Sequence, residues 1–329
     1  MKTISIVTPV YDEEPNLRDC YAAVRLIFDR ELAGYRREHL FCDNASRDDT
    51  LSILREIAAA DPLVKIIVNT RDFGPLRNTF NGVMATSGDA VLLFLPADLQ
   101  DPPELLPKFV ALWEQGYEIV YGIRASREER WPMRGVRNAY YRLLSRFSEF
   151  KVPPGVGDFQ LVDRRVVEAM RQIDDTHPFM RLMTFECGGR AVGVPYTWRA
   201  RKKGHSKNRI LGLVDQGMNG ITSFTWAPVR IGLIAGFVIS FLSIAYAVAD
   251  LVLALLVERR LAQPGIMTLI VAIFFFGGVQ LLFLGFVGEY VLAMHNQLRK
   301  RPVVFERERI NFSRPAETTS QETHIAPLA

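Results

Sequence analysis

The sequence contains little cysteine. Only three occur among its 329 residues, Cys20, Cys42 and Cys187. No two have the spacing of a C-x-x-C pair, and none forms a zinc-ligand spacing with a histidine. Neither a disulfide framework nor a structural zinc site is therefore indicated, and we expect ordinary reduced thiols.

The chain also lacks the glycine-rich sequences of two large nucleotide-binding classes. Neither G-x-x-x-x-G-K-[ST] nor G-x-G-x-x-G is present, which argues against a P-loop nucleotidase and a dinucleotide oxidoreductase. No long apolar stretch precedes the turn signals at Pro9 and Asp12, so no signal peptide is expected. The first domain is therefore predicted to stay in the cytoplasm.

Charge is missing from two long runs in the last third of the chain, residues 231–249 and 266–287. Each is close to the ~20 residues that a helix needs to cross a hydrocarbon core. A buried helical hairpin is the alternative, but neither run carries a polar stripe. We expect two transmembrane helices, at 229–257 and 266–294, joined by a short non-cytoplasmic loop at 258–265.

Basic residues lie outside this pair of runs, whereas the loop offers only Arg259 and Arg260. They are Arg199, Arg201, Lys202, Lys203, Lys207, Arg209 and Arg230 before the first run, and Arg299, Lys300, Arg301, Arg307 and Arg309 after the second. The positive-inside rule predicts a multi-pass protein of the inner or plasma membrane with both termini cytoplasmic. Because the formal net charge of +4 is concentrated near these runs, lipid headgroups or phosphates are expected partners and nucleic acid is not.

Two further segments complete this organisation. Residues 208–228 are predicted to include an amphipathic helix lying along the membrane surface. Residues 295–329 are predicted to form a cytoplasmic basic segment and a disordered tail.

The first 207 residues have the pattern of an α/β domain. Strand-like and helix-like stretches alternate, and they fall at 4–8, 15–32, 39–42, 49–60, 64–68, after 74, and at 90–95. This alternation predicts a doubly wound, mostly parallel sheet. Ligands bind beyond the carboxyl ends of such strands, where residues 9–13, 43–44 and 98–100 supply polar side chains.

Three segments in order carry a resemblance: SIVTPVYDEE at 5–14, DNASRDDT at 43–50 and ADLQDPPE at 97–104. Together they resemble the inverting family-two glycosyltransferases of the GT-A fold. YGIR at 121–124, GDFQL at 157–161 and RKKGHSK at 201–207, followed by two apolar runs, resemble dolichol-phosphate mannose synthases and bacterial polyprenyl-phosphate glycosyltransferases. The resemblance spans about residues 4 to 300.

That resemblance implies an enzyme that transfers a sugar from a nucleotide diphosphate sugar, with a UDP sugar favoured, to a polyprenyl phosphate such as undecaprenyl phosphate. It places the reaction at the cytoplasmic membrane face. The residues implied to bind the nucleotide sugar are Pro9, Tyr11, Glu13, Asp43, Ala97, Asp98, Gln100 and Arg124. Each has a structural alternative; Pro9, for example, also suits the end of a strand.

A metal ion is implied as well, because the departing diphosphate gathers negative charge that a hard cation with oxygen ligands stabilises. We expect Mg²⁺ or Mn²⁺ held by Asp98 and Gln100. The sequence departs from the family here, since Pro96 stands where the first aspartate of Asp-x-Asp belongs. Asp101 and Glu104 fit a helix N-cap and its capping-box partner, so we interpret both as structural.

The acceptor side is implied to contain Asp158, as a base or orienting carboxylate, and Arg201, Ser206 and Lys207, as ligands of the lipid phosphate. Asp158, Asp98 and Arg201 are the expected catalytic residues. A lipid monophosphate is largely ionised near neutral pH, with a second pKa of roughly 6, and needs no strong base. A single displacement at the anomeric carbon would invert its configuration.

Two other functions stay open. A processive polysaccharide synthase shares this pattern, but its Gln-x-x-Arg-Trp signature is met only by Arg127–Trp131, which has arginine first and lies early in the chain. A catalytically degenerate, membrane-anchored nucleotide-sugar-binding scaffold would explain Pro96. Gly277 and Gly278 also leave homo-oligomerisation through the spans open.

Overall fold

The computed structural model describes residues 1–126, 153, 155–173, 178–199, 266–298 and 302–312, together with positions 232, 234–239, 241, 242 and 245. The first half of the sheet domain comprises β1 (Thr3–Val10), α1 (Glu14–Arg30), β2 (Arg36–Asp43), α2 (Thr50–Ala60), β3 (Val64–Asn69), α3 (Pro75–Ala85) and β4 (Ala90–Leu92). The second half comprises the 3-10 helix η1 (Pro103–Leu105), α4 (Leu106–Glu114), β5 (Ile119–Ser126), β6 (Val156–Asp163), α6 (Arg164–Gln172), α7 (Met180–Glu186) and β7 (Ala191–Thr197). Helix α10 (Ile266–Leu298) and strand β8 (Glu306–Ile310) follow.

The strands form one 8-stranded sheet in the order β7-β5-β6-β4-β1-β2-β3-β8. The pairs β1–β2, β1–β4, β2–β3 and β5–β7 are parallel. Strand β6 runs antiparallel to β4 and β5, and β8 runs antiparallel to β3. The predicted α/β class with a mostly parallel central sheet is confirmed, although antiparallel pairings make the whole sheet mixed.

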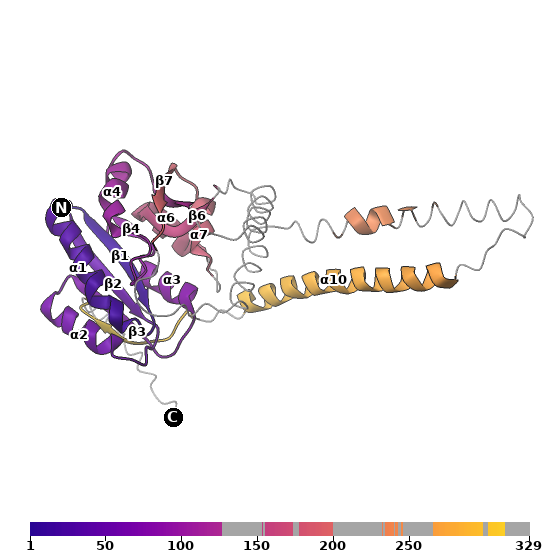
Figure 1. Ribbon diagram of the computed structural model, residues 1–329, viewed down its shortest axis with the longest axis horizontal. Helices are drawn as coiled ribbons and strands as arrows, with labels where there is room; N and C mark the ends of the chain where they lie inside the picture. Colours follow the sequence, from indigo (N-terminus) through magenta and orange to yellow (C-terminus); the bar gives the residue numbers. More distant parts are fainter. Residues whose placement is uncertain are drawn as a thin grey trace, which may run out of the picture.

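Helices cover both faces of the sheet, with α1, α2 and α4 on one side and α3, α6 and α7 on the other (Figure 1). The alternation of side chains along β1 explains both layers. Ile4 and Ile6 pack with Phe109 of α4, whereas Val7 packs with Val83 of α3. A strand buried on both faces is a near-continuous apolar run, as expected for the centre of a parallel sheet.

Most predicted elements of this domain have their counterparts, but β4 is shorter than the predicted strand at 90–95. After Leu92 the backbone makes isolated bonds to two different strands. Leu93 N–H donates to the Gln160 carbonyl and Leu95 N–H donates to the Val7 carbonyl, both at 2.9 Å. The chain thus stays buried while it turns towards Asp98.

Helix α10 corresponds to the second predicted span and extends away from the sheet domain (Figure 1). Within the described residues, one helix is long and apolar enough to cross a membrane, and its most apolar window is Phe275–Leu292. None of that window is buried against the described chain. The first predicted span lies mostly outside the described residues, so the pair of transmembrane helices stays a prediction.

Strand β8 was not predicted. Its alternating charged sequence, Glu306 to Ile310, lacks a run of apolar residues, and it follows the membrane-type helix. The structure nevertheless pairs it with β3, which places Arg307 and Arg309 in the sheet domain instead of a free basic segment after the span. Arg309 forms an ion pair with Glu306 at 2.5 Å, and Glu308 pairs with Arg55 at 2.6 Å.

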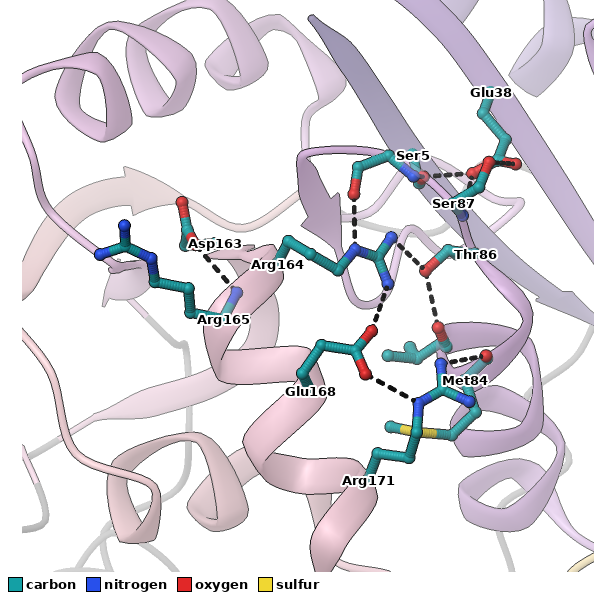
Figure 2. A network of polar contacts seen from close by, with 12 residues as sticks. Ser5, Glu38, Met84, Thr86, Ser87, Asp163, Arg164, Arg165, Glu168 and Arg171 are labelled. Carbon is teal, nitrogen blue, oxygen red and sulfur yellow. Dashed lines mark hydrogen bonds and ion pairs between the residues drawn. The ribbon is translucent and has the colours of Figure 1, made fainter.

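A polar network at the amino ends of the strands joins the two halves of the sheet (Figure 2). Glu38 of β2 is 4% exposed and accepts hydrogen bonds from Ser5, from Lys65, and from both the N–H and the hydroxyl of Ser87. Burial alone would raise the pKa of Glu38, but the hydrogen bonds from Lys65, Ser5 and Ser87 hold it below its ordinary value. The buried carboxylate is therefore charged and satisfied.

The same network reaches helix α6. Arg164 donates from Nε to the Gly88 carbonyl at 2.7 Å and from Nη2 to Thr86 Oγ1 at 3.2 Å, and Arg171 donates to the Met84 carbonyl at 2.8 Å (Figure 2). The end of α3 and the start of β4 are thereby attached to α6. This network stabilises the end of the sheet opposite the polar loops.

Close packing of α3 on the sheet predicts a sensitive glycine. A Cβ at Gly82 would lie 2.3 Å from Cys42 Sγ and 3.0 Å from Val7 Cγ1, both on fully buried side chains. We expect Gly82→Ala to reduce the free energy of unfolding by about 1–3 kcal/mol. Thermal unfolding of the purified protein measures this, with Gly34→Ala as control because nothing lies within 4 Å of its added Cβ. Equal melting temperatures for the two variants would contradict the packing.

Candidate functional site

The loops after β1 and β2 are fastened to each other at the carboxyl edge of the sheet. Asp12 N–H donates to Ser46 Oγ at 2.9 Å, and Arg47 N–H donates to Asp12 Oδ1 at 2.7 Å. Glu13 N–H donates to Thr50 Oγ1 at 2.9 Å. Asp12 and Ala45 adopt left-handed backbone conformations, with φ of 49° and 64°. Such strain concentrates where a surrounding structure fixes a functional loop.

Asp43 stands at the end of β2, next to this junction, and is 1% exposed. Its Oδ1 accepts a hydrogen bond from Ser46 N–H at 3.2 Å. Burial raises the pKa of Asp43, and the nearby carboxylates Asp48 and Asp12 raise it further. A ligand N–H or O–H donating to this carboxylate would therefore stabilise its charged form, as expected for a residue that binds a base or ribose.

An asparagine cluster not predicted from the sequence lies behind Asp43. Asn44 accepts from Asn69 at 3.1 Å and from Phe73 N–H at 3.1 Å, and it donates to Asp72. Asn69 also donates to Asn78 of α3 at 2.9 Å. Amides separated by up to 34 residues give no spacing signal, so only their convergence in space reveals the cluster.

The loop carrying Asp98 faces the same edge. Leu99 has a φ of 55°, and Gln100 N–H donates to Asp98 Oδ1 at 3.2 Å, which makes a tight turn. Burial raises the pKa of the Cys20 thiol to about 12, and the charges of Asp98 and Glu13 contribute to that rise. The charges of both predicted site residues thus act on one buried thiol.

Asp98 and Gln100, the possible metal ligands at this turn, suit a magnesium-type ion only if the substrate supplies further ligands. Asp98 offers a carboxylate, and Gln100 uses its Nε2 to donate to the Arg199 carbonyl at 3.4 Å, which leaves the amide oxygen as its ligand atom. Within the described residues, no group of three or more His, Cys, Asp or Glu side chains is placed to hold a metal. Mg²⁺ commonly uses one or two protein oxygens plus phosphates and water, so the residues fit that mode.

Asp101 has a different role from the predicted N-cap. It is 1% exposed and accepts two bonds of 3.2 Å from Arg124 Nη2 as well as a bond from the Tyr196 hydroxyl. The η1 helix has Pro102 at its N-cap and no side-chain capping bond, and Glu104 pairs with Arg199 at 3.0 Å. The predicted capping box is therefore wrong, because the buried carboxylate requires a charged partner and finds it on β5.

Arg124 is consequently held in a buried ion pair and contacts Tyr196 through Nε at 3.0 Å. Its guanidinium lies 5.2 Å from the Trp198 ring centroid. Its positive charge also helps to lower the pKa of Asp158. Arg124 thus connects the Asp98 loop with the carboxylate predicted for the acceptor side.

Asp158 of β6 forms a two-pronged ion pair with Arg181 of α7. Arg181 donates to it from Nη2 at 2.5 Å and from Nε at 3.2 Å. Burial would raise the pKa of Asp158, but Arg181 and then Arg124 hold it below its ordinary value. The carboxylate is ionised and oriented, which makes it a weak base near neutral pH.

Gln160 explains why Arg181 is in place. Its side chain is fully buried, and its Nε2 donates to the Gly157 carbonyl at 2.8 Å and the Arg181 carbonyl at 3.1 Å. Its Oε1 accepts from Thr184 Oγ1 at 2.8 Å. Helix α7 is thereby fixed to β6, two residues from Asp158. The signal for Arg181 was absent from the sequence because 23 positions separate the partners.

The structure thus gathers most predicted donor-side residues along one edge. Pro9 is the second-last paired residue of β1, Tyr11 and Glu13 follow the strand, and Ala97 is buried next to Asp98. Arg201, Ser206 and Lys207 lie outside the described residues. The chain approaching them is placed, because Arg199 N–H donates to the Gln100 carbonyl at 3.0 Å.

Residues 5–171, which include most of this α/β domain, match the family described as Glycosyl transferase family 2. The chain belongs to that family and is a glycosyltransferase.

Curated relatives match nearly the full length of this chain. The chain is 34% identical to the uncharacterized glycosyltransferase YkcC of Bacillus subtilis, covering 91% of each protein. It is also 34% identical to the SfII prophage-derived bactoprenol glucosyl transferase of Shigella flexneri, covering 91% of this chain and 96% of that protein. Among solved structures, glucosyl-3-phosphoglycerate synthase from Mycobacterium tuberculosis has a TM-score of 0.45 at 20% identity, over 67% of this chain and 78% of that one.

The Asp158–Arg181 pair predicts a change in pH dependence. In Arg181→Gln the carboxylate keeps its burial but loses its main counter-charge, so its pKa rises and it protonates at a higher pH. We expect the acid limb of the kcat/KM profile for sugar transfer to move to higher pH, and kcat/KM at pH 7 to fall about 10- to 100-fold. The exposed Arg165→Gln is the control. A uniformly lower profile with an unmoved acid limb would contradict this role.

Proposed function

We propose that this glycosyltransferase moves a sugar from a nucleotide diphosphate sugar, preferentially a UDP sugar, onto a polyprenyl phosphate, with undecaprenyl phosphate as the favoured acceptor. The transfer inverts the anomeric carbon on a GT-A-type domain at the cytoplasmic membrane face. A full-length relative named bactoprenol glucosyl transferase supports the acceptor class.

The observation that carries this proposal is where the chain leaves the domain. Arg199 bonds to Gln100 beside the Asp98 turn, and the sequence then continues through Arg201, Ser206 and Lys207 to the first apolar run. A lipid phosphate approaching from the bilayer surface meets the enzyme at this part of the chain. Cationic and hydroxyl groups suit its charge.

Each half of the site has a distinct task in this reaction. Pro9, Tyr11, Glu13 and Asp43 hold the nucleoside, while Ala97 and Arg124 line or support the diphosphate side. Asp98 and Gln100 hold Mg²⁺ or Mn²⁺, which when bound offsets the charge on the leaving diphosphate.

The acceptor carries its own nucleophile. Since a phosphate monoester is mostly ionised near neutral pH, it needs orientation more than deprotonation. Ionised Asp158, held by Arg181 at 2.5 Å, is suited to orient the reacting groups and to face the positive charge that develops at the anomeric carbon. Arg201 would neutralise the phosphate.

The return of the chain supports two membrane crossings. Arg199 and β8 both belong to the sheet domain, so the segment between them starts and ends on one side of any membrane. If α10 crosses the bilayer, residues 200–265 must cross it as well, and the charge-free run 231–249 is the candidate. Exposed apolar side chains along α10, such as Phe275 and Leu281, at 62% and 70%, fit contact with lipid.

Transfer to lipid is the direct test. Detergent-purified protein is incubated with undecaprenyl phosphate and a panel of radiolabelled nucleotide sugars, with magnesium, manganese or EDTA, and label extracted into organic solvent is counted. We expect one donor to label the lipid, EDTA to abolish labelling, and Asp158→Asn to reduce it about 100-fold or more.

Lys108→Gln, at an exposed position of α4 with no predicted role, serves as the matched control for loss of charge. Nucleotide binding without lipid labelling across the panel would favour the scaffold function that Pro96 suggests.

Membrane topology gives an independent prediction. A cysteine introduced at Gln263, in the predicted loop, should react with a membrane-impermeant maleimide in intact spheroplasts, whereas one at Ser320 should react only after permeabilisation. Because an even number of crossings separates the two ends of the chain, Ser320→Cys and Lys2→Cys should show the same accessibility and serve as the control pair. Different accessibility of that pair would contradict the proposed hairpin.

A further inference from the structure

The segment that follows α10 is attached to the loop after β3. Just before β8, the Phe305 carbonyl accepts hydrogen bonds from Thr70 N–H at 2.9 Å and from Thr70 Oγ1 at 3.1 Å. The Phe305 ring packs against Phe73, with ring centroids 6.2 Å apart. Two hydrogen bonds and a ring contact therefore hold residues 70–73 against the returning chain.

The 70–73 loop makes two hydrogen bonds to Asn44, the residue next to Asp43. Asp72 accepts a hydrogen bond from Asn44 Nδ2, and Phe73 N–H donates to Asn44 Oδ1 at 3.1 Å. Asn44 is 3% exposed, so its amide has little freedom to find other partners. The nitrogen and the oxygen of the Asn44 side-chain amide both bond to this loop. Because Asn44 follows Asp43 directly, the backbone that carries Asp43 is held as well.

The returning strand has a second attachment on the same side. Asn81 of α3 donates to Glu306 Oε1 at 2.6 Å, and Arg309 pairs with the same carboxylate at 2.5 Å. Helix α3 begins directly after the 70–74 loop and carries Asn78, a partner of Asn69. Loop and helix are thus held together by residues 305–309.

We propose that Phe305 and Glu306 are a positioning element of the donor site, which holds the 70–74 loop and through it Asn44 and Asp43. The inference rests on the proposed donor site at the carboxyl ends of β1 and β2. Only residues 299–304 separate α10 from this element. Donor binding would then be linked through the chain to the end of the apolar helix.

The test removes the side-chain contacts and leaves the backbone bond. In full-length protein, Thr70→Val with Phe305→Ala should raise the KM for UDP-glucose about 5- to 20-fold, because one hydrogen bond and one ring contact no longer order the loop. The kcat and the KM for undecaprenyl phosphate should change by less than about twofold, since the loss is in donor binding alone. An unchanged donor KM in the folded variant overturns the proposal.

Hydrogen exchange provides a readout that does not depend on sugar transfer. In the double variant, amides of residues 70–78 and of 43–46 should exchange faster than in the wild type, while those of β5 and β6 should not. Unchanged exchange at 43–46 overturns the positioning role even if the wild type transfers no sugar. Wild-type inactivity across the donor panel would instead count against the proposed function.

Two further variants separate positioning from general damage. Glu308→Gln lies on the same strand and breaks only the exposed pair with Arg55, so it should leave the donor KM unchanged. Thr70→Ser alone keeps both the hydroxyl donor and the Phe305 ring contact, and should leave the donor KM near the wild-type value. A similar rise in KM for Glu308→Gln would show that any disturbance of β8 has this effect and would overturn the specific role of Phe305 and Glu306.

Discussion

The parallel, in-register pairing of β1 with β2 is the constraint on which the site depends. Val10 is aligned with Asp43 at the end of the pair, so the two loops that follow start side by side. Because the two loops lie close together, Asp12 N–H donates a hydrogen bond to Ser46, and Glu13 N–H donates one to Thr50. An antiparallel partner would have sent one loop to the opposite edge. The donor side of the site is therefore a direct consequence of strand direction.

Buried charge organises the other side. Asp101 is buried, the side chain of Asp158 is 24% exposed, and each carboxylate lies against a cationic partner. Arg124 meets the first and Arg181 the second, and each pair joins two elements distant in sequence. The charge of Arg124 also helps to lower the pKa of Asp158, after the larger effect of Arg181. The geometry of this half depends on satisfying charges more than on strand order.

The return of the chain as β8 links the sheet domain to the apolar helix α10. A free edge at β3 would expose unpaired backbone groups, and β8 covers them. Because β8 follows α10, the segment between Arg199 and β8 is joined to the sheet domain at both of its ends. An apolar segment joined twice to the domain has a more restricted orientation relative to it than one joined at a single point.

Much of this architecture was readable in the sequence. The alternation of apolar runs and helix patterns predicted β1 to α3 closely, because local periodicity decides these elements. The family was predicted from three polar segments that occur in order at the ends of strands. All three lie within residues 5–171, which match the family. The roles of single residues in those segments stay predictions. The short β4 was not predictable, since its end depends on bonds from Leu93 and Leu95 to two other strands.

The sequence by itself determined the α/β class, the family and the apolar character of α10, because each depends on residues close together in the chain. Only the tertiary structure decided that Asp101 binds Arg124 instead of capping a helix, that Arg181 holds Asp158, and that β8 completes the sheet. These contacts join residues separated by 23 positions in the two ion pairs and by far more in the strand pairing. Their partners are chosen by burial, charge and free backbone groups in the folded chain, which no local pattern encodes.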